Sequence, residues 1–301
     1  MSDARGEASP PATSGLDVRM LTVGPIQENA YIVSVAGSKR GLMIDPGAEA
    51  ERLLQAARTL GVEIEAILVT HCHFDHIGAV AEVAHATGAP VYCPEIERGV
   101  LADINSWTPP GFGPFESYEA DHTVQGGEQL SLAGLDIKVL FTPGHSPGHV
   151  TYAIAPAASD RGVAAADESG QVRERTLGER ALLSGDVLFA GSVGRTDLPG
   201  GDWNVLERSI GTLLRAFPAE TAVYPGHMGT TTLGRERDTN PFLAELRVPV
   251  ERPAVGEGPE PAARAVADPA AGSCAAGSRS KPHGARSTCY LSRRGCARAW
   301  K

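Results

Sequence analysis

The stretch THCHFDHIGA, residues 70–79, places three histidines and one aspartate within six positions. A histidine cluster this dense is typical of a metal site, a purification tag or a low-complexity tract. The stretch is internal, is mixed in composition and follows the apolar run IEAILV, so it belongs to folded structure. Metal binding is therefore the chemistry that this segment favours.

Three further potential ligands occur in the same kind of context. The segment KVLFTPG leads into His145, ALLSG into Asp186 and TAVYPG into His227. A lone PGH is commonly a turn with a surface histidine, and a lone SGD a turn or helix cap. All four segments in one chain disfavour that reading, because buried strands of a layered α/β protein deliver their C-terminal residues to a common edge.

Convergence at one edge would bring together five imidazoles and two carboxylates. That set suits two divalent transition ions. The predicted ligands are His71, His73, Asp75, His76, His145, Asp186 and His227.

The surrounding elements follow from hydrophobic periodicity. Apolar residues at helical spacing predict helices over 48–61, with Gly61 as its stop, over 76–88 and over 202–217. The predicted strands cover residues 18–23, 30–35, 41–47, 65–70, 90–94, 149–155, 180–186 and 221–227. A hairpin is predicted over 128–142, with its turn near Gly134, and a last ordered element over 240–246.

Composition divides the chain into three parts. Residues 1–16 and 251–301 are rich in Pro, Ser, Ala and Gly and are expected to be disordered. The folded domain is predicted to span 17–250, with a polar surface insertion at about 156–180. Residues 103–120 lack periodicity and are expected to form a loop that overhangs the site.

Charge and cysteine content limit the functional class. Residues 255–301 carry eight Lys or Arg against three Asp or Glu, so the rest of the chain is more acidic than the net charge of −9 suggests. An acidic body argues against a nucleic-acid surface. Five cysteines without a C-x-x-C pair argue against a disulfide framework, and no apolar run suggests a signal or a membrane span. The expected location is the cytoplasm.

The motifs THCHFDH, TPGHSPGH, SGDVLF and YPGH resemble the ordered motifs of the metallo-β-lactamase superfamily. The segments GSVGRTDLPGGDW and GHMGTTTLGRERDTNPFL narrow the resemblance to glyoxalase II-like hydrolases, over roughly residues 17–246. The resemblance implies an α/β fold, the four-layer αβ/βα sandwich. Only about ten folded residues are expected after RERDTN, so the chain resembles single-domain members that lack a C-terminal helical domain.

The resemblance also implies roles for the predicted ligands. One metal would be held by His71, His73 and His145, and the second by Asp75, His76 and His227, with Asp186 bridging the two. Asp45 in LMIDPG would support the metal loop from behind the ligands, although it could simply begin an Asp-Pro-Gly turn. Arg195 and Asp197 in GRTD are candidates for substrate contact, with a structural salt bridge as the alternative.

The function implied is hydrolysis of a small-molecule thioester of the hydroxyacylglutathione type. Two divalent ions, zinc first with iron or manganese as alternatives, would generate a bridging hydroxide, and Asp75 would accept a hydrogen bond from this nucleophile. No nucleic acid or membrane partner is expected, and the protein would be a monomer or homodimer.

The alternative is a persulfide dioxygenase of the same fold, with one iron held by His71, His145 and Asp186. The complete second ligand set, including YPGHMG around His227, favours the hydrolase.

Overall fold

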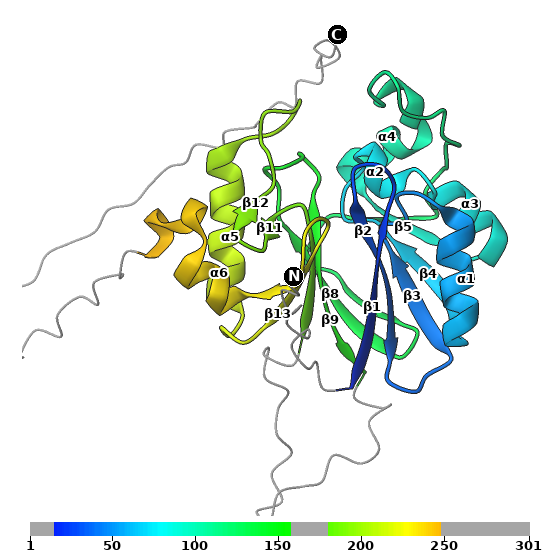
Figure 1. Ribbon diagram of the computed structural model, residues 1–301, viewed down its shortest axis with the longest axis horizontal. Helices are drawn as coiled ribbons and strands as arrows, with labels where there is room; N and C mark the ends of the chain where they lie inside the picture. Colours follow the sequence, from blue (N-terminus) through cyan, green and yellow to red (C-terminus); the bar gives the residue numbers. More distant parts are fainter. Residues whose placement is uncertain (1–14, 158–179, 248–301) are drawn as a thin grey trace, which may run out of the picture. The chain divides into compact units, whose positions relative to one another are not determined.

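The computed structural model describes residues 15–157 and 180–247. Two six-stranded sheets pack face to face, and helices cover the outer face of each sheet (Figure 1). This is the expected four-layer αβ/βα sandwich. The predicted insertion at about 156–180 lies outside the described residues except for residues 156, 157 and 180. Both predicted disordered ends also lie outside them, apart from residues 15 and 16.

The first sheet follows the chain in the order β1-β2-β3-β4-β5-β6. β1, β2 and β3 pair antiparallel, whereas β3 to β6 pair in parallel. Its strands are β1 (Leu16–Val23), β2 (Glu28–Val35), β3 (Arg40–Ile44), β4 (Glu63–Leu68), β5 (Val91–Pro94) and β6 (His122–Val124). The helices α1 (Ala50–Leu60) and α3 (Val80–Thr87) pack on its outer face.

The second sheet has the order β14-β13-β10-β9-β8-β7. Only β10 and β13 pair in parallel. Its strands are β7 (Gln129–Leu132), β8 (Leu135–Phe141), β9 (Val150–Pro156), β10 (Ala181–Gly185), β13 (Ala222–Pro225) and β14 (Thr231–Thr232). The helices α5 (Trp203–Ala216) and α6 (Leu233–Thr239) pack on its outer face.

Shorter elements complete the described part of the chain. They are α2 (Phe74–Ile77), η1 (Glu95–Glu97), α4 (Arg98–Ala102), η2 (Ile104–Ser106), β11 (Leu188–Phe189), β12 (Ser192–Val193), η5 (Pro241–Leu243) and η6 (Glu245–Arg247).

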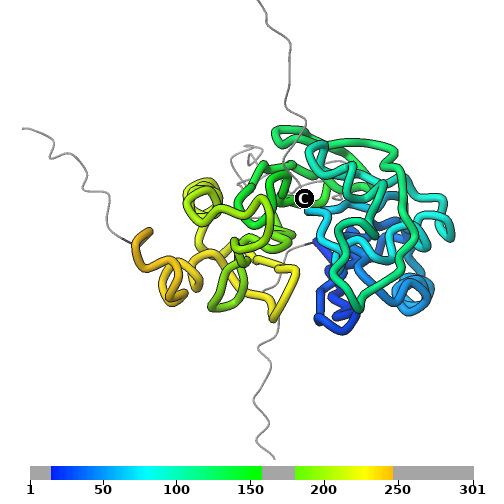
Figure 2. Tube along the Cα trace, turned by 90° about the horizontal axis from the view of Figure 1, so that it is seen from above, coloured from blue at the N-terminus to red at the C-terminus, as the bar shows by residue number. Residues whose placement is uncertain are grey.

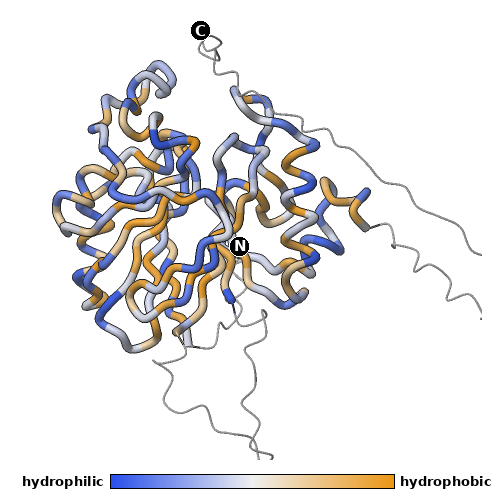
Figure 3. The backbone as a smooth tube through the Cα atoms, turned by 180° about the vertical axis from the view of Figure 1, so that it is seen from behind, coloured by the Kyte–Doolittle hydropathy of each residue, from blue (hydrophilic) through white to orange (hydrophobic). Residues whose placement is uncertain are grey.

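The central strands bury both of their faces, because side chains alternate along a strand. Ile32 of β2 packs with the α1–α3 layer, whereas its neighbours Tyr31 and Val33 enter the core between the sheets. In the second sheet, Leu182 faces α5 and Leu183 faces the inter-sheet core. Hydrophobic residues therefore follow the strands through the interior (Figure 3).

The two halves of the chain meet at the edge where the predicted ligands lie. Seen from above, the blue-to-cyan segments form one half and the green-to-yellow segments the other (Figure 2). Backbone hydrogen bonds join the halves there, from Val150 N to Thr70 O (2.9 Å) and from Asn29 N to Gly226 O (2.7 Å). These bonds tie the end of β4 to the start of β9 and the start of β2 to the end of β13.

The predicted helix over 76–88 is wrong as a single element. It is divided into α2 and α3, because Ala79 N donates to Pro46 O (3.0 Å) instead of continuing the helix. A Cβ on Gly78 would lie 2.5 Å from Gly47 O, so the close approach requires glycine there. Because of this break, the orientation of α2 does not depend on that of α3, and the orientation of α2 sets the direction of Asp75 and His76.

The short β11–β12 hairpin and α6 were not predicted from the sequence. None of the helices in the described ranges is long and apolar enough to cross a membrane.

Candidate metal centre

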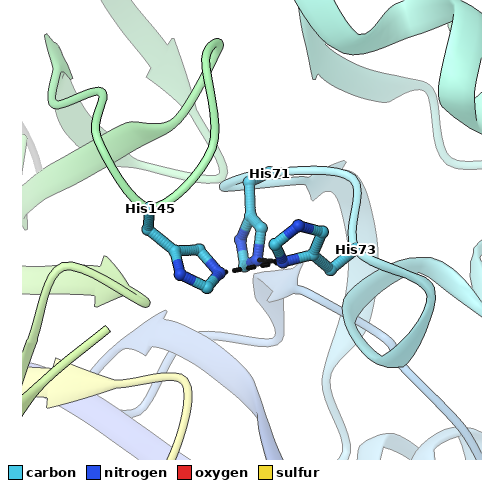
Figure 4. Close-up of side chains that lie close together, drawn as sticks. All are labelled: His71, His73 and His145. Carbon is cyan, nitrogen blue, oxygen red and sulfur yellow. Dashed lines mark hydrogen bonds between the residues drawn. The ribbon is translucent and has the colours of Figure 1, made fainter. Parts of the chain in front are cut away.

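The imidazoles of His71, His73 and His145 face one another at the edge of the sandwich (Figure 4). His71 and His73 come from the loop after β4, and His145 comes from the loop between β8 and β9. Nδ1 of His73 lies 3.1 Å from Nε2 of His71 and 2.8 Å from Nε2 of His145. These three residues are called the first cluster below.

A second cluster consists of Asp75, His76 and His227, whose potential ligand atoms lie within 4.8 Å of one another. Asp75 and His76 are in α2, and His227 follows β13. Oδ2 of Asp75 lies 3.4 Å from Nε2 of His227 and 3.9 Å from Nε2 of His76.

Asp186 lies between the clusters. Its Oδ2 is 3.5 Å from Nε2 of His145 in the first cluster and 3.5 Å from Nε2 of His227 in the second, and its Oδ1 is 3.3 Å from Nε2 of His76. The structure therefore brings all seven predicted ligands together, with Asp186 in the bridging position. The clusters have the composition of a two-metal site.

The hydrogen bonds behind the rings fix which nitrogen carries the proton. Nδ1 of His145 must donate to the carbonyl oxygen of Arg195 (2.8 Å), because a carbonyl only accepts. Nδ1 of His227 donates in the same way to the carbonyl of Gln27 (3.2 Å). In each neutral ring, Nε2 consequently presents a lone pair to the site, as a metal ligand requires.

Asp45 fixes two more rings. Its Oδ2 accepts from Oγ1 of Thr70 (2.6 Å) and faces Nδ1 of His76 (3.1 Å), while its Oδ1 accepts from Thr70 N (2.7 Å). Since the Thr70 hydroxyl donates to Asp45, it accepts from Nδ1 of His71 (3.1 Å). Asp45 thus contacts the residue before His71 and the ring of His76 from the buried side of the cluster.

Electrostatics separate the two clusters. Burial lowers the pKa of His71 well below its usual value and, together with the nearby His145, lowers the pKa of His73 to about 4. Burial also disfavours the cation of His76, but the carboxylates of Asp186 and Asp75 outweigh it and raise the pKa of His76 well above its usual value. His71 and His73 of the first cluster are thus neutral imidazoles, whereas the second cluster combines imidazole with carboxylate.

The residues fit divalent ions on two observations from the described structure. Nε2 of His76 and Oδ1 of Asp186 are buried and have no hydrogen-bond partner, although unsatisfied buried polar atoms are rare. In the first cluster, lone pairs of His71 and His145 converge on Nδ1 of His73 from two sides. A cation in each cluster would satisfy these atoms.

The site is buried on one side and partly exposed to solvent on the other. His71, His76, His145 and Asp186 are buried, whereas Asp75, His73 and His227 are partly exposed. The exposed fraction is 15% for the Asp75 side chain and 19% for that of His227. A substrate can therefore reach the site from the side of these three residues.

Two buried residues that contact the ligand-bearing segments were not predicted from the sequence. His149, which was left out of the ligand set, is fully buried, and its Nε2 accepts from the backbone amide of Asp186 (3.1 Å). Glu97 is also buried and accepts hydrogen bonds from both ligand-bearing loops. The second histidine of TPGHSPGH was a visible signal for His149, but Glu97 stands in no motif.

Arg195 and Asp197 form an exposed bidentate ion pair, with both N–O distances 2.7 Å. They line a surface hollow of about 490 Å³ together with Trp203 and Phe242. The hollow adjoins the first cluster, because the Arg195 carbonyl holds His145. The pair is thus an exposed ion pair next to the backbone carbonyl that accepts from His145.

Comparison with known proteins agrees with this geometry. The family profile described as the metallo-beta-lactamase superfamily matches residues 23–156. The probable metallo-hydrolase YqgX of Bacillus subtilis (strain 168) is 38% identical over 75% of this chain and 96% of its own length. The hydroxyacylglutathione hydrolase GloC of Haemophilus influenzae (strain ATCC 51907 / DSM 11121 / KW20 / Rd) is 31% identical over 76% of this chain and 98% of its own.

Two solved structures are similar over their full length. The BLEG-1 B3 metallo-beta-lactamase is 37% identical with a TM-score of 0.64 and covers 76% of this chain. The protein TTHA1623, solved in a di-iron-bound form, is 39% identical with a TM-score of 0.55 and covers 75%. With a three-histidine cluster and a histidine–aspartate cluster at the shared edge of an αβ/βα sandwich, and with relatives of this identity and coverage, the chain belongs to the metallo-beta-lactamase superfamily of metal-dependent hydrolases.

Proposed function

We propose that this protein hydrolyses a small-molecule thioester of the hydroxyacylglutathione type at a dinuclear site. The observation that carries the proposal is the complete second cluster, Asp75, His76 and His227, joined to the first by Asp186. A relative named as a hydroxyacylglutathione hydrolase supports the substrate class. Zinc is the proposed metal, with iron and manganese as alternatives, and a di-iron form of one similar structure keeps iron in consideration.

Two bound ions would lower the pKa of water toward neutrality and polarise the substrate carbonyl. The chain's own groups supply the geometry. Asp75 is a partly exposed carboxylate of the site, and we assign to it the role of accepting a hydrogen bond from the attacking water. His71, His76 and Asp186 are buried, so the acyl carbon must approach from the opposite, exposed side of the site.

Recognition of the thiol carrier is assigned to the hollow beside the first cluster. Arg195 and Asp197 are the polar groups proposed to contact substrate there, and Trp203 and Phe242 supply apolar surface. A free small molecule fits this hollow better than a nucleic acid, because the chain is acidic. We propose a monomer or homodimer that acts without a membrane or nucleic-acid partner.

Two other activities are measurable on the same site. Hydrolysis of a β-lactam is suggested by the similarity to the BLEG-1 B3 metallo-beta-lactamase. A persulfide dioxygenase would need only one iron at His71, His145 and Asp186 and would leave the second cluster unused.

One preparation tests all three activities. Metal content is quantified, and the same protein is assayed for hydrolysis of S-lactoylglutathione, hydrolysis of a chromogenic cephalosporin, and oxygen consumption with glutathione persulfide. About two metals per chain with thioester hydrolysis supports the proposal. One iron per chain with oxygen consumption, or β-lactam turnover without thioester turnover, contradicts it.

A further inference from the structure

Glu97 joins the two loops that carry the first cluster. Its Oε2 accepts from the backbone amide of Cys72 (2.6 Å), which lies between His71 and His73. Its Oε1 accepts from Oγ of Ser146 (2.5 Å), the residue that follows His145. The same oxygen accepts from the amide of Gly148 (2.7 Å).

The side chain that makes these bonds is held tightly. Glu97 is 4% exposed and lies in η1, directly after β5. A Cβ on Gly148 would lie 2.7 Å from Cγ of Glu97, so the loop backbone approaches this side chain as closely as a glycine allows. On the other loop, Cys72 is buried in the core between the first sheet and its helices, and its Sγ lies 3.4 Å from Sγ of Cys93 in β5.

We infer that Glu97 is a positioning residue for the first cluster: its carboxylate sets the separation of the His71–His73 loop from the His145 loop. The donors are the backbone amides of Cys72 and Gly148 and the hydroxyl of Ser146, so the bonds touch none of the imidazole rings. Hydrogen bonds to a carboxylate are among the stronger kinds, and these three, two from amides and one from a hydroxyl, resist a change in the spacing of the loops.

The second cluster has separate supports. Asp45 holds His76, and the carbonyl of Gln27 holds His227. Removal of the Glu97 carboxylate should therefore act on one cluster selectively. The inference rests on the proposed ligand sets but is independent of the substrate.

The test measures metal affinity in protein that has one complete cluster. Glu97→Gln is placed in a His227→Ala background, which retains the first cluster, and in a His145→Ala background, which retains the second. Glutamine can accept with only one of its two ends, so at least one loop loses its bond. Zinc affinity, measured by chelator competition, should fall about 10–100-fold in the first background and stay unchanged in the second.

Glu95→Gln is the matched control. Glu95 lies in the same short helix, and its replacement removes the same charge, but its carboxylate forms no hydrogen bond with either loop. Its zinc affinity should equal that of the parent in both backgrounds. Equal weakening of both clusters by Glu97→Gln, or no weakening of the first, would overturn the inference.

Amide hydrogen exchange in the metal-free protein gives a readout that needs neither metal nor substrate. Exchange should accelerate at Cys72 and Gly148 in Glu97→Gln, whereas Thr70, whose amide is held by Asp45, should keep its protection. If Glu97→Gln does not fold, Ser146→Ala removes one of the three bonds and should weaken only the first cluster. Uniform acceleration, or a Ser146→Ala protein with unchanged first-cluster affinity, would contradict the role assigned to Glu97.

Discussion

The backbone amide of Asp186 donates a hydrogen bond of 3.1 Å to Nε2 of His149. Because an amide can only donate, Nε2 of His149 is unprotonated, and its Nδ1 carries the proton toward Oγ1 of Thr142 (3.2 Å). The ring also stacks on His71 at 4.9 Å. Burial lowers the pKa of His149 well below its usual value, so this ring stays neutral while it orients the bridging aspartate.

His149→Phe should therefore reduce metal content at both clusters, because it keeps the stacked ring and removes the acceptor. His149→Gln places an amide oxygen near the position of Nε2 and should recover part of the loss. Metal quantification per folded chain, with folding verified by circular dichroism, checks both variants. Equal metal content in His149→Phe and the parent would show that the bond to Asp186 is dispensable.

Asp186→Asn should lower both metal occupancy and kcat, because it keeps the size of the side chain and removes the charge that offsets two neighbouring cations. Loss of a residue that only supports a ligand typically costs about 10–100-fold in metal affinity, so the loss for Asp186 should be at least as large. His227→Ala, in contrast, should empty mainly the second cluster. Zinc binding isotherms of the two variants separate these outcomes, and full activity of His227→Ala with a single iron would favour the dioxygenase instead.

The convergence of the predicted ligands could be expected because the segments that carry them follow buried strands with a strong sequence signal. β4, β10 and β13 are short apolar runs, and their ends had to meet once the strands shared an edge. His149 and Glu97, in contrast, make contacts with residues far away in the sequence. His149 contacts Asp186, 37 residues later, and Glu97 contacts Gly148, 51 residues later. No periodicity encodes such contacts.

The break between α2 and α3 shows the same limit at the level of secondary structure. The apolar residues at helical spacing in the predicted helix over 76–88 are Ile77, Val80, Ala81 and Ala84, and all four are buried. The helix nevertheless ends between them, because a backbone bond to Pro46 replaces a helical one. A tertiary contact overrides local propensity here, and it serves to aim the ligands of α2.

Gly226→Ala should abolish metal binding at the second cluster. A Cβ at this position would collide with Oδ1 of Asp186 and would lie 2.5 Å from Cε1 of His76. Gly229→Ala, three residues further along, is the matched control, because nothing lies within 4 Å of a Cβ there. Inductively coupled plasma mass spectrometry of both proteins measures the effect, and a Gly226→Ala protein with two metals would contradict the geometry.

The loop 103–120 should affect substrate binding more than stability. Phe112 packs on Phe74 at 4.8 Å and is 38% exposed, and Phe74 directly precedes Asp75. Phe112→Ala should raise KM by a few-fold, corresponding to about 0.5–1.5 kcal/mol for an aromatic contact, with little change in Tm. Phe115→Ala, at the more buried position, should lower Tm more. The reverse order of the two variants would make Phe112 structural.

Acidification should empty the second cluster before the first. Metal ions compete with protons for each imidazole, so a ring with a raised pKa loses its metal at a higher pH. In the metal-free protein Asp186 and Asp75 raise the pKa of His76, whereas the pKa of His73 lies at about 4 and that of His71 is also lowered. Between pH 8 and roughly 5, around the ordinary histidine pKa of about 6.5, zinc affinity should fall steeply in His145→Ala protein, which retains the second cluster, and only slightly in His227→Ala protein. A steeper fall in His227→Ala would mean that proton competition at the first cluster dominates, contrary to the lowered pKa values of His71 and His73.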